Sequence, residues 1–253
     1  MTGGILWLSL ILLLISSVTR RSGISSAGWV LLGAYWLMEA WHYASIKDYF
    51  NVMVVVGAAA ISFSFGWRIL SMGMSETAEW ISMAAAICGI LYFPFAEVQS
   101  LSEILIRWTT LLTFWLLAGL NVPVSMESWN MLALNGRSVE IVLACTAIES
   151  IALFAGVILS VRAPRTRRLG ALMLSTATIY ILNIGRNAFV LLAYGEEWFG
   201  QDSFYLAHNV IAKVGSTLVL LLIAYMVFAI LPELLMLIDD LFAELRASRR
   251  PEV

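Results

Sequence analysis

The chain has 253 residues, of which 61% are hydrophobic and only 13% are charged, with a formal net charge of -2. Soluble domains have about 45–50% apolar and about 25% charged residues, so this composition excludes a soluble enzyme, a disordered protein and a nucleic-acid-binding protein. It predicts an all-α polytopic membrane protein, and its two cysteines are too few for a disulfide framework.

Eight apolar segments, taken with their flanking residues, are candidates for membrane-spanning helices, which need about 17–25 residues. In chain order they are Ile5–Val18, Ala27–Ala44, Val52–Trp67, Trp80–Phe95, Ile104–Leu120, Glu140–Val161, Leu169–Tyr194 and Phe204–Leu231. No linker rich in Gly, Ser or Pro divides the chain. We therefore expect a single domain over residues 1–253, with its core at 80–231 and a cytoplasmic tail at 232–253.

Basic residues predict which loops face the cytoplasm, because short cytoplasmic loops carry an excess of Lys and Arg. Such residues cluster in Arg162–Arg168, at Arg20-Arg21 and in the tail from Arg246 onwards. These three assignments are incompatible if all eight segments cross the membrane, because an even number of crossings would then put the four-arginine loop outside.

One apolar segment must therefore not cross. In Ile104–Leu120, the polar residues Glu103, Arg107 and Thr110 form a stripe at helical spacing, which is typical of a helix lying in the membrane interface. We predict about seven transmembrane helices plus this outer interfacial helix. The alternative is that Ile104–Leu120 spans and one basic loop is misassigned.

Short β-compatible pieces follow the predicted interfacial helix. Pro123, Asn130 and the turn dipeptide Asn135-Gly136 break residues 121–140 into segments of strand length. We predict a short extracytoplasmic β-like hairpin segment here.

Three chemically capable residues are predicted to reach the same level near the outer face. Cys145 and His208 are each expected about one turn into a helix that enters from outside, and Arg186 about two turns below the outer end of the helix between them. At 1.5 Å per residue these depths agree to within roughly 6–8 Å. A thiolate nucleophile, an imidazole acid–base and a permanent guanidinium cation together favour acyl transfer through a thioester.

Each of these residues also has a structural interpretation. A lone cysteine in an apolar helix usually packs as a small hydrophobic residue. Arg186 could form an ion pair with Glu149 that stabilises the helix bundle, and His208 could be an interfacial residue. The residues taken singly leave these alternatives open.

The short sequence motifs around the three residues are more specific than the residues alone. They read Ala144-Cys145-Thr146-Ala147-Ile148-Glu149-Ser150, Asn183-Ile184-Gly185-Arg186-Asn187 and Ala207-His208-Asn209-Val210-Ile211. In this order they resemble the exosortase/archaeosortase family, and its archaeosortase A branch most closely. The resemblance extends over about Trp80 to Leu231, and the first three spans are similar only in hydropathy.

The resemblance implies an integral-membrane cysteine transpeptidase without a cofactor or metal. Family substrates are exported membrane-anchored proteins with a C-terminal tripartite signal: a short motif, a hydrophobic helix and a basic tail. In the archaeosortase A branch the motif is Pro-Gly-Phe. The enzyme is thought to cut near the motif and transfer the new C-terminus to a membrane lipid. This implies a multi-pass protein of the archaeal cell membrane, with its site near the extracytoplasmic face.

The resemblance also assigns roles by residue. Cys145 is the nucleophile, Arg186 the arginine of the family pattern, and His208 fills the third position, for which Lys213 is a rival. Glu149, Asn183, Asn187 and Asn209 are candidate supporting residues. Glu149 departs from expectation, since an unpaired acid so near the thiol would disfavour its ionisation.

Two other functions would use the same residues. In a transporter, Arg186 and Lys213 would bind an anion, but the sequence shows no internal repeat and its polar residues gather at one face. A hydrolytic intramembrane cysteine protease would use the same nucleophile with water as the acceptor. The sequence does not separate hydrolysis from transfer, since the nucleophile does not encode the acceptor.

The predicted topology can be tested with single cysteines introduced into a Cys145-substituted background and treated with an impermeant thiol reagent. We expect cysteines within 121–140 and 195–203 to be labelled in intact cells, and Thr166→Cys to be labelled only after the membrane is permeabilised. The parent without introduced cysteines is the control. Labelling of Thr166→Cys from outside would reverse the model.

Overall fold

A computed structural model of the chain describes residues 2–247 and divides into two compact units. Unit 1 comprises the residues up to Ile90, Gly156–Arg162 and the residues from Glu233 onwards. Unit 2 comprises Leu91–Ala155 and Ala163–Pro232. Helices α4 (Glu76–Glu97) and α6 (Ile148–Ser160) therefore contribute residues to both units.

Each of the eight predicted apolar segments coincides largely with a helix. Besides α4 and α6, these are α1 (Thr2–Thr19), α2 (Ser22–Ser45), α3 (Tyr49–Met72), α5 (Gln99–Gly119), α7 (Arg165–Gly195) and α8 (Ala212–Ile230). Within residues 2–247, five helices are long and apolar enough to cross a membrane, and α1 and α6 are shorter apolar helices. The class predicted from composition, an all-α polytopic membrane protein, is confirmed.

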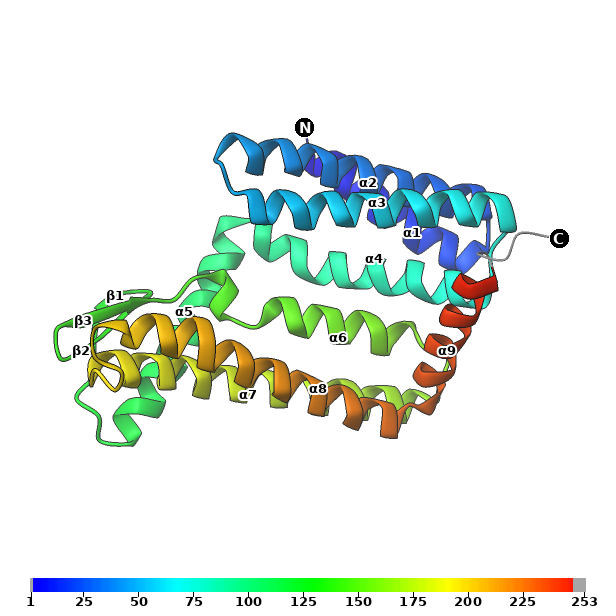
Figure 1. Cartoon of the computed structure of the whole chain (residues 1–253). Helices are drawn as coiled ribbons and strands as arrows, with labels where there is room; N and C mark the ends of the chain where they lie inside the picture. The colour runs from blue at the N-terminus through cyan, green and yellow to red at the C-terminus, as the bar shows by residue number, and fades with distance from the viewer. Residues whose placement is uncertain (1, 248–253) are drawn as a thin grey trace. The chain divides into compact units, whose positions relative to one another are not determined.

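In unit 1, α1, α2 and α3 lie side by side (Figure 1). Small residues allow this packing: a Cβ atom added at Gly28 of α2 would lie 2.9 Å from the side chain of Leu13 in α1. Buried polar side chains connect α2 to α4. The hydroxyl of Ser82 in α4 lies 3.1 Å from the hydroxyl of Ser25 in α2, and it accepts a hydrogen bond of 3.0 Å from the indole of Trp29 in α2.

Basic segments that are distant in sequence lie at one end of unit 1. The carboxylate of Glu79, in the first turn of α4, pairs with Arg20, which follows α1, and with Arg162, which follows α6. The Arg20 contact measures 2.8 Å. These two basic loops therefore lie at the same end of the unit, which supports their common assignment to the cytoplasmic side.

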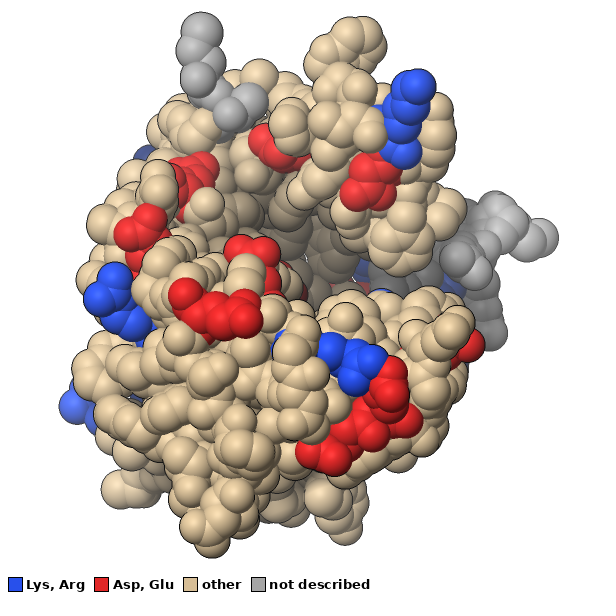
Figure 2. All heavy atoms as spheres, turned by 90° about the vertical axis from the view of Figure 1, so that its left-hand side faces the viewer, with Lys and Arg blue, Asp and Glu red and all other residues tan. Residues whose placement is uncertain are grey.

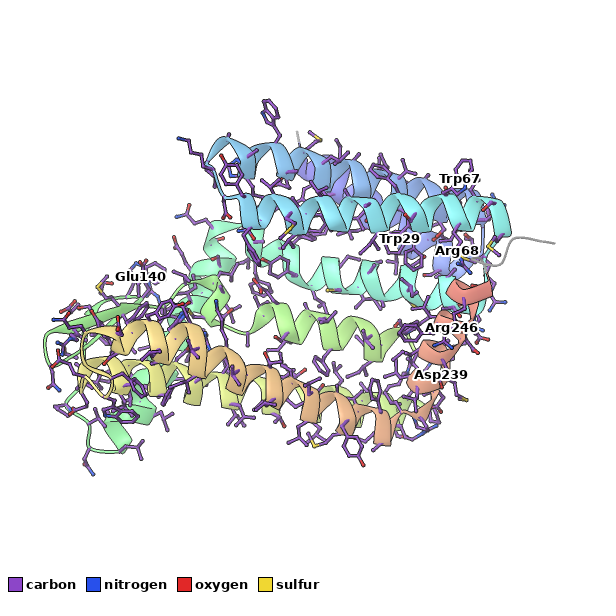
Figure 3. The ribbon with its side chains drawn as sticks, in the orientation of Figure 1. Trp29, Trp67, Arg68, Glu140, Asp239 and Arg246 are labelled. Atoms are coloured by element: carbon purple, nitrogen blue, oxygen red, sulfur yellow. The ribbon has the colours of Figure 1, made fainter. Side chains whose placement is uncertain are left out.

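The predicted cytoplasmic tail contains a helix that sequence analysis did not assign, α9 (Pro232–Ala247). Glu244 of this helix lies 3.5 Å from Arg68 of α3. Figure 3 shows Arg68 beside α9, on which Asp239 and Arg246 are labelled. Helix α9 thus also belongs to this end of unit 1, and of the third basic segment Arg249 and Arg250 lie outside the described residues.

These ion pairs bear on the predicted interfacial helix. Helix α4 starts, and α6 ends, at the Glu79 end of unit 1, so the chain between them leaves from and returns to the opposite end. A single helix in that interval cannot cross without a second crossing to return. In Figure 1, α5 crosses α7 steeply. Both observations support an interfacial α5, although its 21 residues are long and apolar enough to span.

The predicted hairpin segment is a three-stranded antiparallel sheet in the order β1 (Ser125–Ser128), β2 (Met131–Leu134), β3 (Arg137–Glu140). Asn135 and Gly136 join β2 to β3 with φ angles of 52° and 78°, the two positive values that a type I′ turn requires. An apolar core then fixes the sheet to α5 and α7. It consists of Leu117, Leu132, Leu134, Val139, Ala188 and Leu191.

The turn predicts a specific loss of stability. A Cβ at Gly136 would meet nothing within 4 Å, so Gly136→Ala adds only backbone strain, and we expect unfolding to become easier by about 1 kcal/mol. Gly170→Ala is the matched control, because Gly170 lies in α7 with equally open space; it should stabilise by about 0.5–1 kcal/mol. Thermal unfolding in detergent measures both, and a neutral Gly136→Ala would contradict the turn.

Candidate active site

Cys145 is the last residue of a 3-10 turn, Leu143–Cys145, and lies before helix α6. The prediction that it lies one turn into a helix is therefore wrong. Ala147 interrupts the helix because its φ of 61° is left-handed, a conformation that costs a non-glycine residue roughly 1–2 kcal/mol. Between them, buried Thr146 closes the turn with a 2.7 Å hydrogen bond from its hydroxyl to the carbonyl of Leu143.

Two asparagines of α7 hold the backbone of Cys145. The side-chain amides of Asn183 and Asn187 donate hydrogen bonds of 2.7 and 2.9 Å to its carbonyl oxygen. They occupy positions i and i+4, which lie on one face of a helix. Asn187 is only 4% exposed, so its polar side chain is committed to contacts inside the protein.

Arg186 connects this anchor to the imidazole. Its guanidinium donates to Oδ1 of Asn187 at 3.3 Å, and its Nη2 lies 3.4 Å from Nε2 of His208. The guanidinium is a donor only, so Nε2 must accept, and neutral His208 carries its proton on Nδ1. Nδ1 in turn lies 3.4 Å from Oδ1 of Asn209.

His208 lies in a π-helical turn, Tyr205–Ile211, that precedes α8. It is thus about one turn from the start of this helical segment, as predicted, although the turn is not α-helical. Its ring stacks on Phe204, with centroids 5.3 Å apart and planes inclined by 4°. Together with the contacts to Arg186 and Asn209, this stacking fixes the orientation of the imidazole.

Glu149 and Lys213 are not part of this network. The carboxylate of Glu149 is exposed and accepts a 3.5 Å hydrogen bond from the hydroxyl of Tyr92. Among the ion pairs of residues 2–247, none joins Glu149 to Arg186. The alternative in which Arg186 serves as the ion-pair partner of Glu149 is therefore not supported. Lys213 is exposed.

A cavity of about 610 Å³ adjoins the network within unit 2. Its polar lining includes Asn183, Arg186, Glu149 and Lys213, and apolar residues of α7 and α8 complete it. Cys145 and His208 are not among the lining residues, but their chain neighbours Ala144, Ala147 and Ile211 are. Within residues 2–247, no group of three His, Cys, Asp or Glu side chains could hold a metal ion.

Sequence reasoning brought Cys145, Arg186 and His208 to one level, and the structure joins the latter two directly. It named Asn183 and Asn187 only as supporting residues and gave no contact for them; their i, i+4 spacing beside Arg186 was the available signal. It missed the stacking of Phe204 on His208, although four residues separate them.

Comparisons with known proteins identify the family of the chain. Residues 1–229 match the model of the transmembrane exosortase family (Exosortase_EpsH). The chain is 28% identical to archaeosortase A of Haloferax volcanii, with 86% of this chain and 83% of that protein covered. It is 24% identical to archaeosortase A of Natronomonas pharaonis, with 87% and 79% covered. No solved structure matches the chain.

The family match also covers the first three helices, where sequence analysis had identified similarity in hydropathy alone. The similarity is thus a property of both units.

Proposed function

The chain belongs to the transmembrane exosortase family, and we propose that it is a cysteine transpeptidase that cleaves C-terminal sorting signals of exported proteins. Family membership supports a membrane-embedded, sortase-like enzyme. The thioester mechanism, the tripartite signal with its Pro-Gly-Phe motif and transfer to a lipid belong to the proposal.

One chain of contacts carries the chemical part of the proposal. It runs from the carbonyl of Cys145 through Asn187 to the guanidinium of Arg186, and from there to the imidazole of His208. A nucleophile, a permanent cation and an acid–base group from three separate segments are thereby connected. His208 is favoured over Lys213 as the third group because it bonds to Arg186, whereas Lys213 is exposed.

In the first step, Sγ of Cys145 attacks the scissile carbonyl carbon while Nε2 of His208 takes the thiol proton. Arg186 turns its guanidinium from His208 to the oxyanion that forms, which frees Nε2 for this proton. The carbon–nitrogen bond then breaks, and His208 returns the proton to the leaving amine. A thioester with Cys145 and a free amine on the departing tail result.

In the second step, a hydroxyl or amine of a membrane lipid attacks the thioester. His208 takes the proton of this acceptor and passes it to the leaving sulfur, which restores the Cys145 thiol. An ester or amide to the lipid replaces the original peptide bond. Water as the acceptor would give hydrolysis with the same residues and a free carboxyl terminus.

We place the reaction at the extracytoplasmic face of an archaeal cell membrane. Within unit 2, the basic residues Arg165, Arg167 and Arg168 lie at the start of α7, the predicted cytoplasmic end, whereas Arg186 and the sheet contacts lie toward its other end. Figure 2 views the chain from the side that carries the sheet of unit 2 and shows both acidic (red) and basic (blue) side chains.

The nucleophile is tested by Cys145→Ala and Cys145→Ser. We expect both to abolish processing of a reporter that ends in a motif, an apolar helix and a basic tail, because no other strong nucleophile is proposed at this site. The mass of the reporter's C-terminus is followed in membranes with wild-type enzyme abundance. Cys88→Ser is the matched control and should retain activity. Normal processing by Cys145→Ala would exclude the thioester mechanism.

The role of Arg186 is tested by comparing Arg186→Lys with Arg186→Ala. Lysine keeps the charge but lacks the planar set of donors, so both variants should slow acyl-enzyme formation. Loss of one oxyanion donor costs about 100–1000-fold in rate. Single-turnover kinetics are measured beside thermal stability in detergent. A near wild-type rate for Arg186→Lys would leave Arg186 with a structural role only.

A further inference from the structure

The carbonyl of Cys145 has an unusual set of partners. Among residues 2–247, the hydrogen bonds that it accepts come from two side-chain amides of α7, those of Asn183 and Asn187. A carbonyl oxygen has two lone pairs, so these two donors use its full capacity. The backbone of the proposed nucleophile is thus attached to α7 and not to the helix that follows it.

The turn around Cys145 explains why this anchor is needed. The left-handed Ala147 prevents Cys145 from joining the hydrogen-bonded ladder of α6, so its carbonyl lacks a helical partner. A partly buried carbonyl without a hydrogen-bond donor is unfavourable, and the amides of Asn183 and Asn187 supply its donors. Without the amides, the turn would have no fixed position relative to α7.

The two asparagines differ in their second contact. Asn183 bonds only to the carbonyl of Cys145 among its described hydrogen bonds, whereas Oδ1 of Asn187 also accepts from Nη1 of Arg186. A single buried side chain therefore orients both the nucleophile's backbone and the guanidinium.

We propose that Asn187 is a positioning residue, which sets Cys145 and Arg186 in register for acyl transfer, while Asn183, which also lines the cavity, holds the Cys145 turn without a contact to Arg186. This inference rests on the proposed transpeptidase function. Asn187 touches neither substrate nor the reacting atoms; it acts through Arg186 and through the carbonyl of Cys145. Its loss should therefore affect the rate more than the loss of Asn183 does.

The experiment is a pair of double-mutant cycles on the full-length enzyme, read as single-turnover processing of the tripartite-signal reporter. Asn183→Ala removes one of two donors to the carbonyl and should slow the reaction about 3–10-fold, the kinetic equivalent of one hydrogen bond. Asn187→Ala also releases Arg186 and should slow it about 100-fold, since small misplacements of reacting groups have costs of this size.

Both substitutions are then repeated in the Arg186→Lys background. There the Asn187 contact to the guanidinium no longer exists, so the cost of Asn187→Ala should fall to that of Asn183→Ala. The cost of Asn183→Ala should be the same in both backgrounds. A structural role alone would not produce this coupling, because each asparagine loses one bond to the same carbonyl and thermal stability should fall similarly.

Equal costs of Asn187→Ala and Asn183→Ala in the wild-type background, or a cost of Asn187→Ala that Arg186→Lys leaves unchanged, would overturn the inference. If Asn187→Ala does not fold, Asn187→Ser keeps a polar group at this position and takes its place in the same cycle. Normal processing by Cys145→Ala would overturn the proposed function together with this inference. An inactive Cys145→Ala beside uncoupled Asn187 would overturn the inference alone.

Discussion

The satisfaction of one backbone carbonyl, that of Cys145, organises the candidate site. A backbone carbonyl that leaves its helix needs another hydrogen-bond donor. Asn183 and Asn187 provide it for Cys145, at 2.7 and 2.9 Å. This requirement brings the turn to α7, and Arg186 lies between the same two asparagines in sequence. The imidazole of His208 then completes the network from the start of α8. A helix-breaking turn could not otherwise be held at this level.

The network depends in turn on the apolar core at the sheet-bearing end of α7. Ala188 and Leu191 follow Arg186 by two and five residues and pack on Leu132 and Leu134 of β2. Outside this core, Asn135 in the turn between β2 and β3 donates a 3.2 Å hydrogen bond to the carbonyl of Gly195 at the end of α7. The sheet therefore fixes the segment of α7 that carries the polar residues, while α5 covers the same core through Leu117.

Sequence alone predicted the eight apolar helices and the hairpin segment, but neither α9 nor the local breaks between elements. The apolar segments coincided with helices because apolar segments of this length seldom form any other structure. The pair Asn135-Gly136 predicted its turn because few residue pairs readily adopt positive φ. Ala147 gave no such signal, since alanine favours a helix, and Cys145 was consequently placed inside one. The π-helical turn of His208 likewise gave no signal in the sequence.

The length of α7 has a consequence for the fate of a thioester. Its 31 residues measure about 46 Å, whereas the hydrocarbon layer is about 30 Å thick. A lipid-exposed sheet edge is not tolerated in that layer, so the sheet that packs on Ala188 and Leu191 lies beyond it. Arg186, two residues earlier, then lies at the boundary, where a permanent charge is tolerated and water is abundant. In the proposed reaction, a bound substrate that seals the cavity beside Arg186 would favour attack of a lipid on the thioester carbonyl, whereas a cavity left open to water would favour hydrolysis.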